Sequence, residues 1–282
     1  MVDAKYTFKG TKADTSVVTF TGTDYSAIPL KPNHRTNILG ALLTKPADFV
    51  VDINAGWDTP DEVVNVVTVA NAGELQNAIN NAPAGENTEI ILDGDITLDD
   101  LLAGLLSTRA GEPQSLVIPA GKVITLNLGG NTLSHEEEQT AAYGMIVNNG
   151  DLTITNGTVI YKDTATYTQD PGWASNTVWN NGILTIEEGT TLINDSSASA
   201  AEYGYPHVID NYAKLTINGG TLTNNTDYSS IRIWCTTDDN TEVVINGGTF
   251  NGSIDFQTPN ASANKGTLTI NGGTFNGDNY TK

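Results

Sequence analysis

The amino-acid sequence predicts an all-β protein, most of which is a three-sided parallel solenoid. One phrase, clearest as LTINGG and VVINGG, recurs five times at intervals of 25 to 32 residues, starting at Leu152, Leu184, Leu215, Val243 and Leu268. A repeat of this length is typical of stacked architectures. Each copy alternates apolar and polar residues, which indicates a strand with one inward face. Glycine follows in each copy and tolerates the positive φ of a sharp corner.

Aligning the copies places their apolar residues in three columns that would face the interior. Because one strand cannot bury its inner face alone, stacked coils are the expected solution, with about 4.8 Å between neighbouring coils. The variable interval favours a three-sided coil whose corners carry loops of different length. The columns are Leu152, Leu184, Leu215, Val243 and Leu268; then Ile154, Ile186, Ile217, Ile245 and Ile270; then Val159, Leu192, Leu222, Phe250 and Phe275.

Two earlier coils and a helical cap are predicted upstream of the clear repeats. Residues 122–134 contain the same strand, glycine corner and returning leucine, and residues 89–98 resemble a further coil. Before them, Asn71 is a candidate N-cap with Glu74 three residues later, and Pro83 ends the segment. A short amphipathic helix here would cover the open end of the coil. Its apolar residues, at helical spacing, are Leu75, Ala78, Ile79 and Ala82.

The stretch VVTVANAGELQNAINNAPAGENTEIILDGDITL, with the following LVIPAGKVITLNLGGNTLS, resembles the start of the domains called pectate-lyase-like. The resemblance covers residues 66–282. It implies that this part of the chain is a right-handed parallel β-helix. It implies little about activity, because one fold carries many functions.

Residues 1–58 lack the repeated phrase and are expected to form a small N-terminal β segment, with alternating runs at 16–22 and 48–56. The stretch IPLKPNHRTNILGALLTKPADFVVDINAGWD resembles the last strands of fimbrillin-like domains from the surfaces of Gram-negative anaerobes. This resemblance implies a cell-surface protein with a fimbrial or other surface protein as partner. Residues 59–65, with Pro60 and clustered acids, predict a linker. The matching residues are Arg35, Thr36, Asn37, Ile38, Gly40, Leu42, Leu43, Thr44, Phe49, Val51 and Ile53.

Composition excludes several classes of function. The chain has 13 Lys and Arg against 33 Asp and Glu, a formal net charge of −20, which argues against binding nucleic acid or an anionic membrane surface. No apolar run is long enough to predict membrane insertion. The single cysteine, Cys235, excludes an intrachain disulfide and a cysteine-based zinc site. The first ten residues do not predict a signal peptide, and the resemblances imply a cell-surface or secreted protein.

The strands that precede each repeat are the expected binding face. Their predicted inward residues are Ile146, Val178, Val208, Ile231 and Ile254, which places Val147, Trp179, Ile209, Arg232 and Asp255 in one outward column. A flat ring and a guanidinium group in one column are typical of a sugar-binding surface. An alternative interpretation is that the aromatic residues only cover corners of the coil. The candidate ligand-binding residues are Trp173, Trp179, Tyr203, Tyr205, His207, Arg232 and Trp234.

A neighbouring column is predicted to contain Asn148, Asn180 and Asp210. These residues would form an amide ladder, or Asp210 would belong to a carboxylate pair for glycoside hydrolysis. The alternative catalytic candidates are Asp210, Asp238, Asp239 and Asp255. The Gly-His-Gly and Arg-Ile-Lys motifs of β-helix polygalacturonases do not occur in the chain, which disfavours an enzyme. No cofactor or metal is expected, and Ca²⁺ at the acidic stretches 93–100 or 236–242 is the alternative.

The sequence therefore favours a non-enzymatic, adhesin-like surface or secreted protein whose partner is a polysaccharide or a host or bacterial glycan. Two alternatives stay open. One is a polysaccharide hydrolase or lyase, and the other is a purely structural spacer or fimbria-associated component.

Overall fold

The computed structural model describes residues 7–11, 17–21, 65–98, 115–137, 144–164, 175–197, 205–235, 241–257 and 266–277. The chain divides into two compact units, Met1–Val63 and Val64–Lys282. In the first unit, β1 (Thr7–Thr11) and β2 (Val17–Thr21) form an antiparallel hairpin. The alternating run at 16–22 predicted β2. The predicted strand at 48–56, the fimbrillin-like stretch and residues 59–64 of the predicted linker lie outside the described residues.

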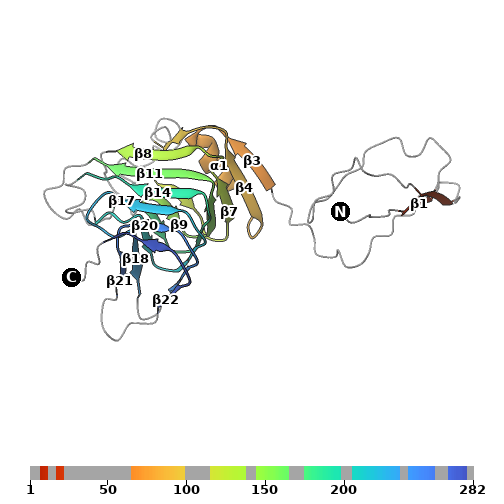
Figure 1. The fold of residues 1–282 in the computed structure, drawn as a ribbon. Coiled ribbons are helices and arrows are strands. Elements are labelled where there is room, and N and C mark those ends of the chain that lie inside the picture. The colour runs from red at the N-terminus through yellow and green to blue at the C-terminus, as the bar shows by residue number, and fades with distance from the viewer. Residues whose placement is uncertain are drawn as a thin grey trace. The chain divides into compact units, whose positions relative to one another are not determined.

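The second unit is a right-handed parallel β-helix, in which successive coils add strands to three parallel sheets (Figure 1). The first sheet contains β3 (Asn65–Val69), β4 (Asn87–Leu92), β7 (Val123–Asn127), β10 (Asp151–Thr155), β13 (Ile183–Ile186), β16 (Lys214–Ile217), β19 (Glu242–Ile245) and β22 (Thr267–Ile270). The second contains β5 (Ile96–Thr97), β8 (Thr132–Glu137), β11 (Gly157–Asp163), β14 (Thr190–Asn194), β17 (Thr221–Asn224), β20 (Thr249–Asn251) and β23 (Thr274–Phe275). The third contains β6 (Leu116–Ile118), β9 (Gly144–Asn148), β12 (Asn176–Asn180), β15 (Ile209–Asn211), β18 (Ile231–Trp234) and β21 (Ile254–Gln257).

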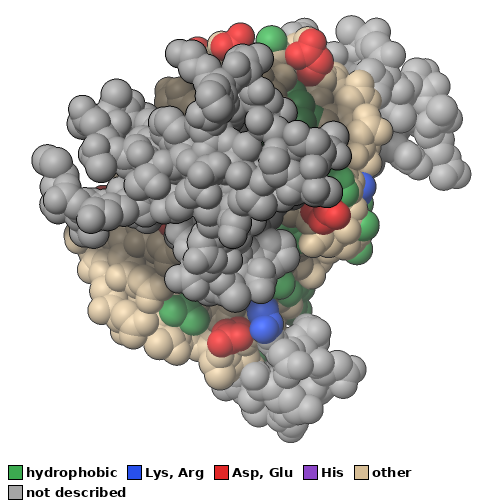
Figure 2. Space-filling view, turned by 90° about the vertical axis from the view of Figure 1, so that its right-hand side faces the viewer, with side chains coloured by type: hydrophobic (Ala, Val, Ile, Leu, Met, Phe, Trp, Pro, Cys, Tyr) green, Lys and Arg blue, Asp and Glu red, His purple; other side chains and the backbone are tan. Residues whose placement is uncertain are grey.

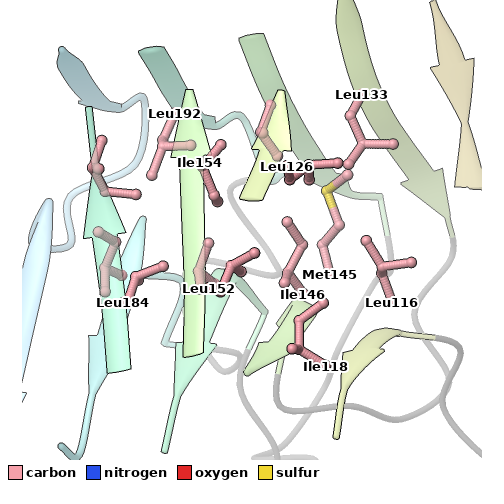
Figure 3. Close-up of a cluster of buried hydrophobic side chains, with 14 of the residues drawn as sticks. Leu116, Ile118, Leu126, Leu133, Met145, Ile146, Leu152, Ile154, Leu184 and Leu192 are labelled. Carbon is pink, nitrogen blue, oxygen red and sulfur yellow. The ribbon is translucent and has the colours of Figure 1, made fainter. Parts of the chain in front are cut away.

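Strand register confirms the three predicted apolar columns. Leu184 pairs with Leu152 on one side and with Leu215 on the other, and the other two columns pair in the same way. From β10 to β20, every column member is at most 1% exposed. Figure 3 shows Leu152 and Leu184 beside Met145 and Ile146 of β9, all within one interior. Each fully buried aliphatic side chain of this kind contributes about 1.5–3 kcal/mol, so the columns are the main stabilising feature.

The predicted helix is α1 (Ala72–Asn81), and it covers the N-terminal end of the coil. The Asn71 side chain accepts a 2.9 Å hydrogen bond from the Glu74 N–H, and the Glu74 carboxylate accepts one from the Ala70 N–H. The first bond satisfies an N–H group that the first helical turn leaves without a partner, and the second ties the residue before the N-cap to the helix. Leu75 and Ile79 are fully buried, and the helix contacts β3, β4 and β6. Among the described residues, no helix is long and apolar enough to cross a membrane.

Glycine forms the corners that the repeated phrase predicted. Gly220, Gly248 and Gly273 have φ of +86°, +103° and +119°, which disfavours any residue with a Cβ. The corner is also crowded, because a Cβ on Gly220 would lie 2.5 Å from the Thr190 carbonyl oxygen of the preceding coil. The repeated glycine therefore allows both a left-handed backbone and close contact between coils.

Gly220→Ala is expected to lower the free energy of unfolding more than Gly189→Ala does. Both glycines have φ above +80°, so both substitutions place a side chain in the left-handed region at a cost of about 1 kcal/mol. Only Gly220 adds a steric clash, because a Cβ on Gly189 would have its nearest neighbour 4.0 Å away. We expect a further loss of about 1–3 kcal/mol at Gly220, measured by urea denaturation. Equal losses would contradict the close packing of the corners.

Candidate ligand-binding face

The candidate face is the outward side of the third sheet. Strand register places one outward residue from each coil in a single column, which runs Val117, Val147, Trp179, Asp210, Arg232 and Asp255. Trp179 and Arg232 therefore share an outward column, as the sequence predicted. Asp210 lies between them and was not predicted in this column.

The predicted register of residues 207–211 is wrong by one residue. Ile209, and not Val208, pairs with Val178 and Ile231 in the buried column, so Ile209 is inward and Asp210 takes the outward place. Both Val208 and Ile209 are buried and apolar, so the local pattern does not distinguish them. The feature that stays constant is the number of residues between this strand and the following repeat. Asn148, Asn180 and Asn211 each stand four residues before the first apolar residue of the following repeat, and counting back from it would have given the correct register.

Asn211 accordingly replaces Asp210 in the predicted amide ladder. The Asn148 side-chain N–H₂ donates to Asn180 Oδ1 at 2.8 Å, and the Asn180 N–H₂ donates to Asn211 Oδ1 at 2.6 Å. Asn180 also donates to the Lys214 carbonyl, and its oxygen accepts from the Gly182 N–H. All three amides are fully buried. A buried polar group is stable only when it is hydrogen-bonded, so this ladder supports the turn directly beside the candidate face.

An ion pair between Arg232 and Asp210 forms the centre of the face. The Arg232 Nε donates to Asp210 Oδ1 at 2.8 Å, Nη2 donates to Asp210 Oδ2, and Nη2 also donates to the Tyr212 hydroxyl at 2.8 Å. Asn176, on β12 of the preceding coil, donates to Asp210 Oδ2 at 3.2 Å. The Asp210 side chain is 1% exposed and the Arg232 side chain is 16% exposed. This bidentate geometry is the arrangement that stabilises a charge pair with little access to water.

Burial and charge act on this pair in opposite directions. Burial raises the pKa of the Asp210 carboxyl, while the guanidinium of Arg232 and hydrogen bonds from Tyr212 and Asn176 act to lower it. Burial, together with the nearby Asp210 carboxylate, raises the pKa of the Tyr212 hydroxyl to about 12, so Tyr212 is a neutral hydrogen-bonding group at physiological pH.

Three aromatic rings surround the ion pair. The ring centroids of Trp179 and Tyr212 are 5.5 Å apart, and those of Tyr212 and Trp234 are 6.5 Å apart. The Arg232 guanidinium carbon lies 5.2 Å from the centroid of Trp234. All three rings are half-buried. They come from three successive coils, and we call them, with Arg232, the aromatic row. Tyr212 was not among the residues predicted from the sequence; it follows Asn211, and its outward place can be found by the same counting from the repeat.

His207 lies beneath this face rather than on it. Its side chain is 2% exposed, and its Nδ1 is hydrogen-bonded to the Ser229 hydroxyl at 2.7 Å. Its ring meets Tyr228 edge to face, with centroids 5.5 Å apart. Burial, followed by the positive charge of Arg232, lowers the pKa of His207 to about 3. His207 is therefore a neutral internal residue and not a surface ligand, in contrast to its prediction as a binding residue.

Of the remaining candidates, the structure describes Tyr205 and Asp255. Tyr205 is exposed and meets Tyr228 edge to face at 5.7 Å. Trp173, Tyr203, Asp238 and Asp239 lie outside the described residues. Asp255 accepts a 3.4 Å hydrogen bond from Gln257, and the strand that carries Arg232 separates it from Asp210. The alternative carboxylate pair of Asp210 and Asp255 would therefore have Arg232 between its two members.

Acidic side chains are spread over the described surface rather than gathered in one patch in the view of Figure 2. Among the described residues, no group of three or more His, Cys, Asp or Glu side chains is placed to hold a metal ion. Residues 93–98 of the first acidic stretch and 241–242 of the second belong to the described residues, whereas 99–100 and 236–240 lie outside them.

The fold places the second unit among the parallel β-helix proteins. Comparisons with protein-family models, with curated proteins and with solved structures found no match. The geometry of the candidate face is therefore the basis for a functional proposal.

Arg232→Met is expected to destabilise the second unit, and adding Asp210→Asn should reverse most of the loss. The single substitution leaves the Asp210 carboxylate buried without its counter-ion, which typically costs about 3–5 kcal/mol. In the double variant the buried group is a neutral amide, so that cost disappears. Urea denaturation of the wild type, both single variants and the double variant measures the coupling. Additive effects would contradict a stabilising role for the pair.

Lowering the pH from 6.5 to 4.5 is expected to destabilise the wild type through His207. The folded state takes up this proton only near pH 3, whereas the unfolded state takes it up near pH 6.5. The unfolded state therefore binds more protons in this window, and the free energy of unfolding falls by about 2 kcal/mol from this group as the pH is lowered. His207→Gln should show a correspondingly smaller difference between the two pH values by urea denaturation. The same pH dependence in both proteins would show that His207 is not buried in its neutral form.

Proposed function

We propose that this protein is a non-enzymatic carbohydrate-binding protein of the cell surface or secreted fraction, and that it binds glycan chains along the aromatic row. The observation that carries the proposal is the set of three neighbouring rings, Trp179, Tyr212 and Trp234, on one outward face. Ring faces pack against the apolar faces of sugars, while hydroxyl and amide groups at their edges bind the sugar hydroxyls.

The ion pair supports the row more than it serves as a ligand group. The Nε and Nη2 groups of Arg232 are occupied by Asp210 and Tyr212, so this guanidinium is not poised to clamp a free carboxylate. Its position over Trp234 and its bond to Tyr212 hold both rings in place. Rigid aromatic groups lose little conformational entropy on binding, which favours recognition by a preformed surface.

Two sequence resemblances support the proposed location at the cell surface or in the secreted fraction. Residues 66–282 resemble pectate-lyase-like domains, and the parallel β-helix agrees with that likeness in fold. Residues 1–58 resemble the end of a fimbrillin-like domain, which supports a surface role and a fimbrial or other surface protein as a partner. The adhesin-like function is proposed on these resemblances together with the aromatic row.

Removal of two rings, by Trp179→Ala with Trp234→Ala, is expected to weaken carbohydrate binding strongly. Affinity electrophoresis in gels containing xylan, galactomannan, alginate or polygalacturonate supplies the measurement. The wild type should be retarded by at least one of these polysaccharides. The double variant should bind at least about tenfold more weakly, because a buried aromatic anchor contributes well over 1 kcal/mol.

Ile183→Ala is the matched control, because Ile183 is also an exposed apolar residue but lies on β13 of the first sheet. It should bind as the wild type does. Reducing ends and unsaturated products are measured in parallel incubations, and their release would favour a polysaccharide-degrading enzyme instead. Retention of full binding in the double variant would remove the aromatic row from the proposal.

A further inference from the structure

The C-terminal end of the β-helix exposes side chains whose counterparts in the middle coils are buried. The last strand of each sheet is β21, β22 or β23, and we call these three strands the terminal coil. Phe256, Ile270 and Phe275 of this coil are 37%, 50% and 45% exposed. Their register partners one coil earlier are Ile233, Ile245 and Phe250, each 0% exposed. These exposed residues thus belong to the internal columns, and no further coil covers them among the described residues.

The two ends of the β-helix are covered differently, although the N-terminal edge strand β3 also exposes Val66 and Val67, at 56% and 36%. At the N-terminal end, α1 packs on the coil and brings Leu75 and Ile79 into the interior. At the C-terminal end, the described residues include no corresponding helix. Phe250 and Phe275 stack there with centroids 4.9 Å apart and planes 8° apart, so one more aromatic ring could continue the same column.

The terminal coil also presents free strand edges. The Thr267 N–H donates to the Thr241 carbonyl and the Thr274 N–H donates to the Gly248 carbonyl, both in the preceding coil. Successive peptide groups along a strand point to opposite neighbours, so the N–H groups of Leu268 and Phe275 face the open end. Proteins commonly protect such edges with lysine, proline or a covering element, because unprotected edges pair with other chains.

Charge indicates which partner can approach this end. Residues 266–277 contain no Asp, Glu, Lys, Arg or His, although the chain carries a formal net charge of −20. Within β21, the charged residue is Asp255, which belongs to the outward column. Two copies of an acidic protein repel each other over most of their surfaces, but this end is a neutral and apolar exception.

We propose that the terminal coil is a dimer interface, in which two copies of this chain meet end to end about a twofold axis. An axis through β22 sets the β22 strands of the two copies antiparallel to each other. It also sets β21 of each copy against β23 of the other. Along the axis of the β-helix the chain advances steadily from β21 through β22 to β23. The strand that lies farthest out in one copy, β23, therefore faces the strand that lies farthest back in its partner, β21. All three pairs then meet at one spacing, and the internal columns become continuous across the junction.

A second copy fits this end better than an unrelated strand does. A single added strand would pair with one edge and leave the other two open. A coil of the same cross-section pairs with all three edges and covers Phe256, Ile270 and Phe275 together. Association with the N-terminal end of another copy is disfavoured because α1 fills the interior there with Leu75 and Ile79, although Val66 and Val67 of the edge strand β3 are exposed. The expected assembly is therefore a closed dimer and not a fibre.

Light scattering of the full chain after size exclusion tests the proposal. The wild type should have about twice the chain mass of 29.8 kDa, falling toward the monomer on dilution. Ile270→Lys combined with Phe275→Lys should halve the mass at the same concentration. Ile183→Lys is the matched control, because Ile183 is 45% exposed on β13 and the substitution adds the same charge away from the end. The control should remain a dimer.

A cross-link distinguishes this interface from any other, and it does not depend on the stability of the lysine variants. Thr269 is exposed on β22, near the proposed axis, so Thr269→Cys should form an intermolecular disulfide under mild oxidation. Thr185→Cys occupies the equivalent position on β13 and should not. The native Cys235 is fully buried. A wild type that is monomeric at all concentrations, a dimer that survives the lysine substitutions, or larger head-to-tail assemblies would each overturn the proposal.

Discussion

The structure of the second unit depends on one constraint: each coil must place its side chains directly above those of the preceding coil. Parallel strands hydrogen-bond in a fixed register, so a residue type that suits one coil has to suit the next. Leucine and isoleucine therefore fill continuous internal columns, asparagine forms buried ladders at one corner, and glycine occupies another corner where neighbouring backbones nearly touch. The repeated phrase in the sequence is the frame that this constraint requires.

The same constraint produces the candidate face, although the residues there do not repeat. Trp179, Asp210 and Arg232 are different in chemistry, yet they occupy one outward column because their coils are in register. The frame brings Arg232 against Asp210, and their ion pair then orients Tyr212 and Trp234. The outward surface can thus vary freely between coils while the interior holds each side chain at a defined place. This division explains why the repeats carry the fold and the intervening strands carry the proposed binding site.

A stacked architecture also makes its ends chemically different from its middle. A coil in the middle is covered on both sides, whereas an end coil exposes the inner columns and free strand edges unless another element lies on it. The N-terminal end has α1, whose N-cap and apolar face are encoded within 11 residues of sequence from Asn71. The terminal coil has neutral, apolar residues instead, and the twofold assembly proposed for it would bury them without any new structural element.

Sequence alone determined the features that depend on local pattern: the inward columns, the glycine corners, the capping helix and the outward place of Trp179 and Arg232. The alternation of apolar and polar residues predicts which side chains face inward, and the repeat of the phrase predicts that the coils stack. Local alternation did not determine the register of β15, because Val208 and Ile209 are equally apolar and the preceding loops differ in length; the structure established it, and the sequence carries it only in the spacing to Leu215 of the following repeat. That single position made Asp210 the partner of Arg232, placed Asn211 in the amide ladder and buried His207. Contacts between coils are separated by about 20 to 35 residues in the chain, and no local pattern specifies which side chains will meet across that distance.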